Sequence, residues 1–586
     1  MAARSGGAVH RPRDRRSLGR RLTPFAIVAG VVLVVVLLFG SHGTSPAQTL
    51  AQRFVNAWAA GDIATMYSEV DPATQHRLTP SDFATAYRTA DETATVQDHR
   101  AGRARSPKGA AVDVPVTVTT RIFGTLRSSF HIPTATIGGT LRVLWSDNLA
   151  FPGLGPGQHL TRTTHMPSRA SLLARDGTPL AHGVPSAGGQ RSSPLGAAAT
   201  EITGLLGPIP ADRAGELRDL GYPPTAQVGL DGLERAFQTQ LAGTPGGELS
   251  AGGRVIASST AHRGRAVRTT ISPRLQTEAV NDLAGRLGAI VAMRPSTGEL
   301  LALAGIPLSG LQPPGSTFKM ITVTGVLEAH LANSSTTFPI QTGTVLSGVS
   351  LQNANGESCG GTLANAFAVS CNSVFAPLGA KLGAARLLSV ARSFGFNAPT
   401  GILGAATSTI PAASITDDLA AGSTAIGQGE VQATALQMAI VASTIADRGL
   451  RPRPTLALGA IQRPVRAVPS TVARTVRRLM LGVVAFGTGT AAQITGVQVA
   501  GKTGTAELTQ TAGCSSSSSQ TSTTSSSGTQ ACAPNDPANT DAWFAAFAPA
   551  LRPRITVAVL LVRDGAGGTT AAPVAHQMLV AGLKSG

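Results

Sequence analysis

The sequence predicts a multidomain α+β protein that begins with a single transmembrane helix. Three observations support this prediction. The chain has 586 residues, which is more than one hydrophobic core organises. One uncharged apolar run lies near the N-terminus. Two sets of alternating, strand-like segments are separated by loop-rich and helical stretches, which indicates several α+β domains in series.

The basic tail and the apolar run come first along the chain. Residues 1–21 carry seven arginines and one acid, which predicts a cytoplasmic tail. Residues 22–43 carry no charge, and as a helix they would span about 33 Å, enough for a bilayer core of about 30 Å. We therefore expect an uncleaved, single-pass anchor in the cell membrane. A cleaved signal peptide is the alternative, and both interpretations place the rest of the chain outside the cytoplasm.

Three exported regions follow the anchor. Residues 46–155 combine apolar residues at helical spacing with three alternating segments, which predicts a cone-like domain resembling nuclear transport factors. Residues 160–265 are loop-rich and carry little chemistry. Residues 266–586 begin with a strand, a turn and a strand, continue through helical stretches, and end with three strands and a helix. This order predicts one antiparallel sheet, assembled from distant segments, on a helical lobe.

The composition narrows the function classes. The formal net charge is +17, but nearly every cation is an arginine, a bias that we attribute to GC-rich codons. The sequence has no stripe of basic and aromatic residues of the kind that binds nucleic acid. The spacing of the cysteines does not match that of common zinc sites. The sequence therefore predicts no nucleic-acid partner and no zinc site. The chain has five lysines, which are Lys108, Lys319, Lys381, Lys502 and Lys584. A lysine in such a chain can do what arginine cannot, which is to lose its proton in a suitable site.

The four cysteines allow disulfides in an exported protein. Cys514 and Cys532 bracket a Ser/Thr-rich insertion, residues 514–532, which we expect to be disordered. A disulfide there would close the loop and stabilise the fold by about 3 kcal/mol. A pair between Cys359 and Cys371 is the less obvious alternative.

Ser316 and Lys319 are the first candidates for catalysis. They lie three residues apart at the start of a helix expected over Ser316–Leu331, so both side chains face one side. A serine hydroxyl becomes a strong nucleophile when a neighbouring base takes its proton, and a buried lysine can be that base. The helix N-terminus supplies N–H groups for developing negative charge. Alone, this pair of residues is a weak signal.

Two further motifs follow in order. Ser370 offers a hydroxyl that passes a proton, and Asn372 offers an amide that holds a substrate backbone. On an expected strand, Lys502 supplies a fixed cation, and Gly504 lets a peptide backbone approach closely. The hydroxyls of two more residues share one face of that strand, Thr503 and Thr505. Ser-x-x-Lys, Ser-x-Asn and Lys-Thr-Gly in this order, each on the element its role requires, are together specific.

With these motifs the chain resembles class B penicillin-binding proteins, the monofunctional transpeptidases of the bacterial cell wall. Further stretches within residues 160–586 are similar to that family, including RASLLARDGTPLA, GLDGLERAF, STGELLALAG, GQGEVQATALQMA and GTGTAAQITGVQVAGKTGTAE. The resemblance implies a dimerisation (pedestal) domain over residues 160–265 and a penicillin-binding, β-lactamase-like transpeptidase domain over residues 266–586. The N-terminal domain resembles the extra domain of methicillin-resistance-type members, and the low lysine content suits an actinobacterial source.

The resemblance also implies a mechanism. Ser316 attacks the D-Ala-D-Ala carbonyl of a peptidoglycan stem peptide while Lys319 accepts its proton, and Ser370 relays a proton to the leaving D-Ala. Backbone N–H groups of Ser316 and Thr505 form the oxyanion hole. An amine of a neighbouring stem captures the acyl-enzyme, and β-lactam antibiotics acylate the same serine. Lys502 binds the substrate carboxylate. The expected partners are a membrane glycosyltransferase and other cell-wall assembly proteins.

The chain departs from the family pattern at two places, neither of which touches the three motifs. Asp541 stands where His precedes Ala-Trp-Phe in the family, and Ser272 stands where Thr-Ile is followed by Asp. Three other functions remain open at this stage. A D,D-carboxypeptidase or a β-lactamase-like hydrolase would use the same motifs with water as acceptor, and a non-catalytic divisome scaffold would use none of them.

Overall fold

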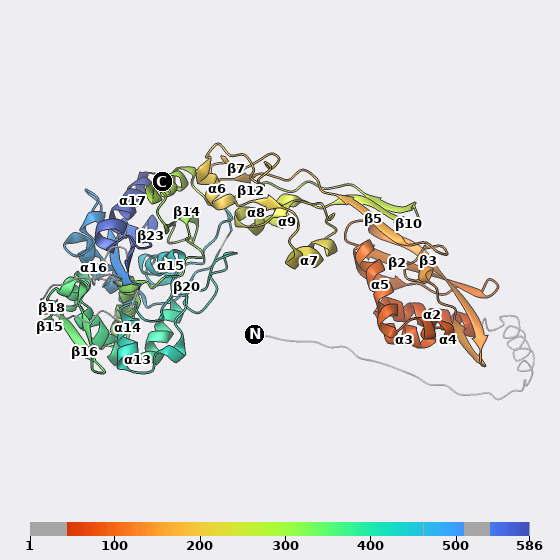
Figure 1. Cartoon of the computed structure of the whole chain (residues 1–586), viewed down its shortest axis with the longest axis horizontal. Helices are drawn as coiled ribbons and strands as arrows, with labels where there is room; N and C mark the ends of the chain where they lie inside the picture. Colours follow the sequence, from red (N-terminus) through yellow and green to blue (C-terminus); the bar gives the residue numbers. More distant parts are fainter. Residues whose placement is uncertain (1–43, 461, 509–538, 585–586) are drawn as a thin grey trace, which may run out of the picture. The chain divides into compact units, whose positions relative to one another are not determined.

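The computed structural model describes residues 44–460, 462–508 and 539–584, which form two compact units. One unit comprises residues 44–161 and 249–257, and the other comprises residues 162–248 and 258 onward. Figure 1 shows the ribbon coloured along the sequence. The expected cytoplasmic tail, the expected anchor, the Ser-rich insertion, and Cys514 and Cys532 lie outside the described residues.

The first unit is a four-stranded antiparallel sheet packed against four helices (Figure 1). The helices are α2 (Pro46–Ala60), α3 (Ile63–Glu69), α4 (Pro72–Arg77) and α5 (Pro80–Ala94), and the strands are β1 (Val96–Ala101), β2 (Ala111–Thr120), β3 (Gly124–Ile137) and β4 (Thr140–Val143). A serine, threonine or aspartate side chain caps each helix N-terminus. The core contains a cluster of aromatic rings, in which the buried Trp145 donates its indole N–H to Tyr87 at 2.9 Å.

Two strands pass from one unit to the other. β5 (Leu160–His165) leaves the first unit, β10 (Gly246–Ala251) returns to it, and both belong to a three-stranded sheet with β11 (Arg254–Ser259). Between them the chain forms short elements: β6 (Leu172–Leu173), β7 (Pro179–Ala181), α6 (Ala197–Thr203), β8 (Leu206–Gly207), α7 (Ala214–Asp219), β9 (Val228–Gly229), α8 (Gly232–Ala236) and α9 (Gln238–Ala242). β12 (Val267–Arg268) pairs with β6. The loop-rich character expected of this region follows from these short pieces.

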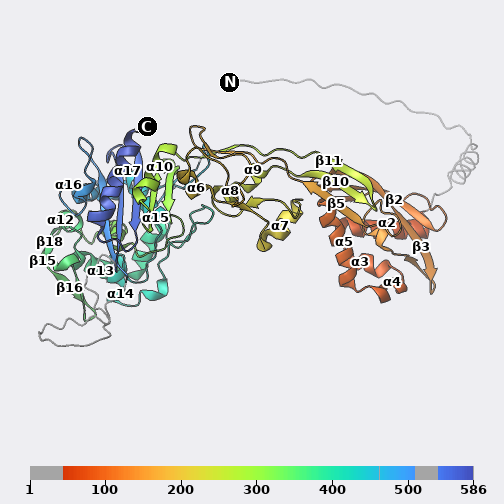
Figure 2. The same ribbon diagram turned by 45° about the horizontal axis from the view of Figure 1, so that its top comes forward.

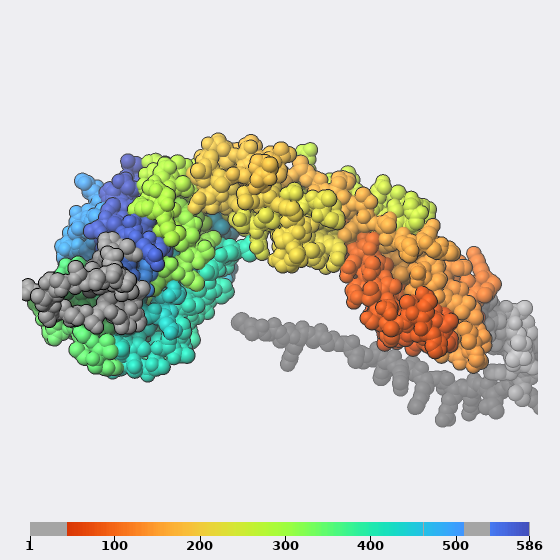
Figure 3. All heavy atoms as spheres, in the orientation of Figure 1, coloured from red at the N-terminus to blue at the C-terminus, as the bar shows by residue number. Residues whose placement is uncertain are grey.

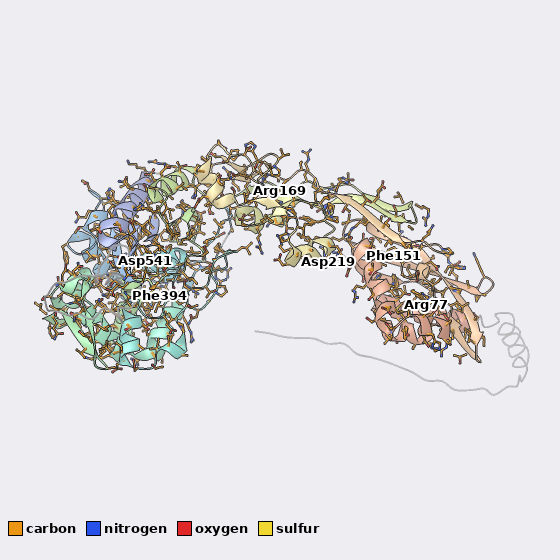
Figure 4. All side chains as sticks on the ribbon, in the orientation of Figure 1. Arg77, Phe151, Arg169, Asp219, Phe394 and Asp541 are labelled. Carbon is orange, nitrogen blue, oxygen red and sulfur yellow. A yellow bond between two sulfur atoms is a disulfide. The ribbon has the colours of Figure 1, made fainter. Side chains whose placement is uncertain are left out.

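A buried ion cluster ties these short elements together. Glu234 on α8 accepts hydrogen bonds at 2.7 Å from the Nε atoms of both Arg169 and Arg191, and all three side chains are at most one-tenth exposed. Figure 4 labels Arg169. Breaking such a cluster would leave an uncompensated charge in a poorly hydrated place. The cluster therefore joins separate segments of a region that has little regular secondary structure.

The second unit is built around a five-stranded antiparallel sheet in the order β14-β13-β23-β22-β21. The strands are β13 (Gly288–Met293), β14 (Leu300–Gly305), β21 (Ala500–Glu507), β22 (Thr540–Ala548) and β23 (Ile555–Leu561). Sequence-distant segments thus form one sheet, with β21 at an edge. α10 (Pro273–Leu283) and α17 (Ala572–Lys584) cover one face, and α15 (Ala435–Ala446) covers the other (Figures 1 and 2).

Alternation along β22 fixes the two faces of the sheet. Trp543 and Ala545 join the core that contains α15, whereas Ala542 and Phe544 join the core that contains α17. Every residue of the strand is buried, because helices cover both faces. Figure 3 shows the heavy atoms of the chain as spheres in the orientation of Figure 1.

The helical lobe contains the remaining elements. They are α11 (Lys319–Glu328), β15 (Thr337–Gln341), β16 (Gly343–Leu346), β17 (Val349–Gln352), β18 (Cys359–Thr362), α12 (Leu363–Ala368), α13 (Asn372–Ser393), α14 (Asp418–Ala425), β19 (Leu450–Arg451), β20 (Val465–Arg466) and α16 (Ser470–Ala485). Within the described ranges, α13 alone is long and apolar enough to cross a membrane. More than half of it is buried, and it packs on α11 and α14, so it is a core helix of this lobe.

Candidate active site

Ser316 lies in a tight 3₁₀ turn, η3 (Gly315–Phe318), that leads directly into α11. Gly315 has a positive φ of 50°, and a Cβ there would lie 2.6 Å from the carbonyl oxygen of Thr505. Only glycine therefore lets this turn lie against β21. The helix expected over Ser316–Leu331 starts as a 3₁₀ turn and ends at Glu328, because His330 adopts a left-handed φ of 55°.

Lys319 is fully buried and points at the second motif. Its Nζ atom lies 2.6 Å from the carbonyl oxygen of Ser370, 2.7 Å from Oδ1 of Asn372 and 3.3 Å from Oγ of Ser370. Within the described chain, the partly exposed Ser316 hydroxyl makes no hydrogen bond. A neutral lysine has two N–H groups, which the two short bonds use, and its lone pair stays available.

Ser370 joins the two buried lysines. Its Oγ accepts a hydrogen bond from Lys502 Nζ at 2.9 Å, in addition to the contact with Lys319. The residue adopts a left-handed φ of 66°, which is unusual for serine and stores backbone strain. A disulfide between Cys359 and Cys371 holds the next residue to β18. The pairing that looked less obvious from sequence therefore exists, and it lies inside the Ser-x-Asn motif.

Asn372 already uses both ends of its amide. Oδ1 accepts from Lys319, and Nδ2 donates to the carbonyl oxygen of Gln352 at 2.8 Å. The neighbouring Ser373 N–H donates to the buried Asn353 at 2.8 Å. The turn that carries Ser370 and Asn372 is thus fastened to the β16–β17 hairpin, so its side chains are preorganised around Lys319.

The backbone of β21 presents N–H groups to the turn that carries Ser316. Leu508 N–H bonds to Asn539 O, at the end of the ladder with β22. In an antiparallel ladder the hydrogen-bonded positions alternate, so the N–H of Thr505 faces the open edge of β21. Gly504 packs under Pro314, since a Cβ there would lie 2.8 Å from the Pro314 oxygen. An N–H donor is therefore available beside Ser316 on this edge.

The two threonines of this strand have different surroundings. Thr503 is buried, and its hydroxyl lies 2.5 Å from that of Thr488, which follows α16. Thr505 is partly exposed, and its hydroxyl accepts from the N–H of Gly567 at 3.3 Å. Both lie on the face predicted by the two-residue period. Thr488 had escaped the sequence reasoning, although it lies in the GTGTAAQITG stretch; nothing in its local pattern marks it as a neighbour of Thr503.

Comparisons with known proteins identify the family of this chain. Residues 288–580 match the penicillin binding protein transpeptidase domain, and residues 185–268 match the penicillin-binding protein dimerisation domain. The chain belongs to the class B penicillin-binding proteins. The family, the dimerisation domain and the transpeptidase domain were all predicted from the motifs, and these predictions are confirmed.

Several relatives of this penicillin-binding protein come from mycobacteria. It is 33% identical over 434 residues to the peptidoglycan D,D-transpeptidase PbpA of Mycolicibacterium smegmatis, covering 63% of this chain and 81% of the relative. A solved structure of PBPA from Mycobacterium tuberculosis has a TM-score of 0.55 and 29% identity, covering 71% of this chain and 99% of that one. The same mycobacterial protein has been solved as an imipenem acyl-enzyme complex, with a TM-score of 0.54, 28% identity, and 71% and 98% coverage.

Burial controls the charge of both lysines in this penicillin-binding protein. Burial and, second, the neighbouring Lys502 hold the pKa of Lys319 well below its usual value. Burial lowers the pKa of Lys502 to about 7. Lys319 is therefore the residue that gives up its proton first, and Lys502 retains a proton more readily. This division matches a base at Lys319 and a cation at Lys502.

The rate of acylation by a β-lactam should show a bell-shaped pH dependence. The rate falls in acid because protonated Lys319 cannot accept a proton, and it falls above about pH 7 as free Lys502 loses its charge. The second-order acylation rate, measured from pH 5 to pH 10, checks this. A rate that keeps rising to pH 10 would show that no cation at Lys502 is needed.

Loss of the disulfide should slow acylation more than it unfolds the chain. Replacing Cys371 by alanine frees the strained turn at Ser370, so we expect acylation to slow by about tenfold, equivalent to about 1.4 kcal/mol. Cys359→Ala, which leaves Cys371 in place, should have the same effect. Circular dichroism checks the fold. Full activity of both variants would show that the turn needs no disulfide.

Asp541 occupies a buried position at the start of β22 (Figure 4). Its Oδ1 accepts from the N–H of Arg563 at 2.9 Å, and burial raises the pKa of its carboxyl to about 6. Its strand partner is Ala506, the residue after Thr505. The second departure, Ser272, lies at the start of α10. Neither residue contacts Lys319, Ser370 or Lys502. Over the described ranges, no cluster of residues could hold a metal ion.

Proposed function

We propose that this chain is a peptidoglycan D,D-transpeptidase that works through an acyl-enzyme on Ser316. The observation that carries the proposal is the fully buried Lys319, whose amine is held by Ser370 and Asn372 one helical turn from Ser316. Lys319 takes the proton of the Ser316 hydroxyl as that oxygen attacks the penultimate D-Ala carbonyl. The N–H groups of Ser316 and Thr505 receive the negative charge on the carbonyl oxygen.

The remaining site residues handle the leaving group and the substrate. Ser370, between the amines of Lys319 and Lys502, passes a proton to the departing D-Ala. Lys502, Thr503 and Thr505 bind the terminal carboxylate, and Gly504 leaves room for a peptide along the open edge of β21. The side-chain amide of Asn372 binds the substrate backbone once its hydrogen bond with Gln352 or Lys319 breaks. An amine of a second stem peptide then takes the acyl group from Ser316. No metal or cofactor enters these steps.

The finer organisation is part of the same proposal. Residues 22–43 anchor the chain in the cell membrane with the N-terminus in the cytoplasm, and the enzyme works outside. Residues 46–155, with their helices and four-stranded sheet, act as a spacer or docking module of the nuclear-transport-factor type. The dimerisation domain covers 160–265 and the transpeptidase domain 266–586. A membrane glycosyltransferase supplies the glycan strands, and other cell-wall assembly proteins are further partners.

An acyl-transfer assay tests the proposed function. The full chain receives a stem pentapeptide ending in D-Ala-D-Ala together with an amine acceptor, and mass spectrometry follows both products. We expect the cross-linked amide from the wild type and no product from Ser316→Ala. Release of D-Ala without the amide product would favour a carboxypeptidase. No reaction by a folded wild type would favour a scaffold.

A further inference from the structure

Four arginines surround a cavity of about 490 Å³ in the second unit. The cavity lies where α15 ends, beside α16 and the turn between β22 and β23. Its polar lining is Asp447, Arg448, Arg477, Arg552 and Arg554. Three separate segments of the fold therefore bring positive charge to one place.

This charge has little compensation within the protein. In the described part of the chain, none of the four arginines forms a salt bridge. Arg474 and Arg478 on α16 add to the positive field: burial, then Arg474, Arg448 and Arg478, lower the pKa of Arg477. The one acid, Asp447, is half-buried, and burial raises the pKa of its carboxyl despite the nearby arginines. Like charges gathered in this way destabilise the unliganded fold.

Arg477 also carries an unpaired donor. Its Nε atom is buried and has no hydrogen-bond partner within the described residues. A buried donor without a partner costs about 1–3 kcal/mol. An anion in the cavity would remove both penalties, because it would accept hydrogen bonds and neutralise the arginines.

We propose that this cavity binds a phosphoryl anion, in the form of a phosphate ester. A phosphoryl group presents several oxygens in different directions and accepts paired hydrogen bonds from more than one guanidinium, whereas a planar carboxylate matches one. The cavity also has an apolar wall of Ala446, Leu551 and Pro553, and Leu551 is 66% exposed. This wall suits the organic part of an ester. The source is either an anionic phospholipid headgroup or a soluble phosphate ester.

The cavity is separate from the catalytic site. On β22, Ala542 and Ala545 pair with Thr505 and Lys502, and the cavity begins beyond the end of that strand at Ala548. Six residues of strand, about 20 Å, separate the partner of Thr505 from this end, and three residues, about 10 Å, separate the partner of Lys502 from it, so the ligand would not overlap a peptide or β-lactam at Ser316. Binding here is therefore independent of the proposed acyl-enzyme chemistry.

Thermal unfolding of the full chain in a neutral detergent tests the proposal. Inorganic pyrophosphate, compared with sodium chloride of equal ionic strength, should raise the Tm of the wild type and of the control Arg274→Gln, whose exposed arginine lies on α10. The double variant Arg477→Gln, Arg552→Gln should bind pyrophosphate at least about tenfold more weakly. Without ligand the same variant should unfold at an equal or higher temperature, because repulsion is relieved. A purely structural role for these arginines predicts a lower temperature.

Two ligand comparisons identify the source. Phosphatidylglycerol in the micelles, but not phosphatidylcholine, stabilises the wild type if the ligand is a lipid headgroup; glycerol 3-phosphate does so if it is a soluble ester. The proposal is overturned if chloride or citrate stabilises as well as pyrophosphate, or if the double variant responds like the wild type. Acylation by a β-lactam, unchanged in every variant, shows that each has folded.

Discussion

Replacing Lys319 by arginine should lower the rate of β-lactam acylation by at least about a thousandfold without unfolding the chain. Arginine keeps the positive charge and several donors but cannot release a proton to act as a base. The site needs a neutral amine, because Lys319 lies fully buried beside a second buried lysine. Stopped-flow or gel-based acylation by a fluorescent penicillin measures the rate.

The control for this variant is Lys381→Arg, a change at an exposed lysine of α13. It should acylate at the wild-type rate, which separates the role of Lys319 from the general effect of exchanging a lysine. Lys319→Met, which removes the amine and its charge, should be as slow as Lys319→Arg. A Lys319→Arg variant that acylates within about tenfold of the wild type would assign the base to another residue.

Replacing Lys502 by methionine should have opposite effects on binding and stability. Substrate loses its carboxylate partner, so we expect kcat/KM for a D-Ala-D-Ala peptide to fall by about a hundredfold or more. The variant should be more stable than the wild type, because the folded state no longer buries an amine whose charged form burial disfavours. Lys502 is fully buried, and its pKa is lowered to about 7. After the lost hydrogen bonds to Ser370 and Thr503 are included, the free energy of unfolding at pH 7 should rise by about 2 kcal/mol.

The size of the stability gain of Lys502→Met depends on pH in a defined way. A lysine whose pKa is lowered on folding binds fewer protons in the folded state than in the unfolded state between about pH 7 and its ordinary value of 10.5. Stability of the wild type therefore rises with pH in that window, and the gain of Lys502→Met shrinks from pH 7 to pH 10. Urea unfolding at pH 7 and pH 10 checks both statements. A variant that is less stable than the wild type at pH 7 would contradict them.

The sequence predicted the chemistry of the site better than its geometry. Ser-x-x-Lys, Ser-x-Asn and Lys-Thr-Gly carry their meaning in residue type and spacing, so they point to a family without a structure. In contrast, the residues of a strand do not by themselves show which other strand it pairs with. Nevertheless, the order of the elements, with strands at both ends of the region and helices between them, correctly indicated one sheet assembled from distant segments.

Contacts between residues far apart in the chain could not be predicted from the sequence. Ser370 adopts a left-handed φ that no rule of residue preference assigns to serine, because the surrounding fold enforces it. The choice of Cys359 as the partner of Cys371 depends on how β18 returns to the motif. The hydroxyl of Thr488 meets that of Thr503 across fifteen residues, and Arg477 and Arg552 line one cavity although they lie far apart in the sequence. Such neighbours appear only once the chain has folded.

The most direct test of the account is the position of the covalent adduct. The full chain is incubated with benzylpenicillin, digested with trypsin, and mapped by mass spectrometry beside Ser316→Ala. The account predicts one penicillin on the peptide that ends at Lys319, attached to Ser316, and no adduct on the variant. An adduct on Ser370 or any other serine, or none on a folded wild type, would contradict the assignment of Ser316 as nucleophile.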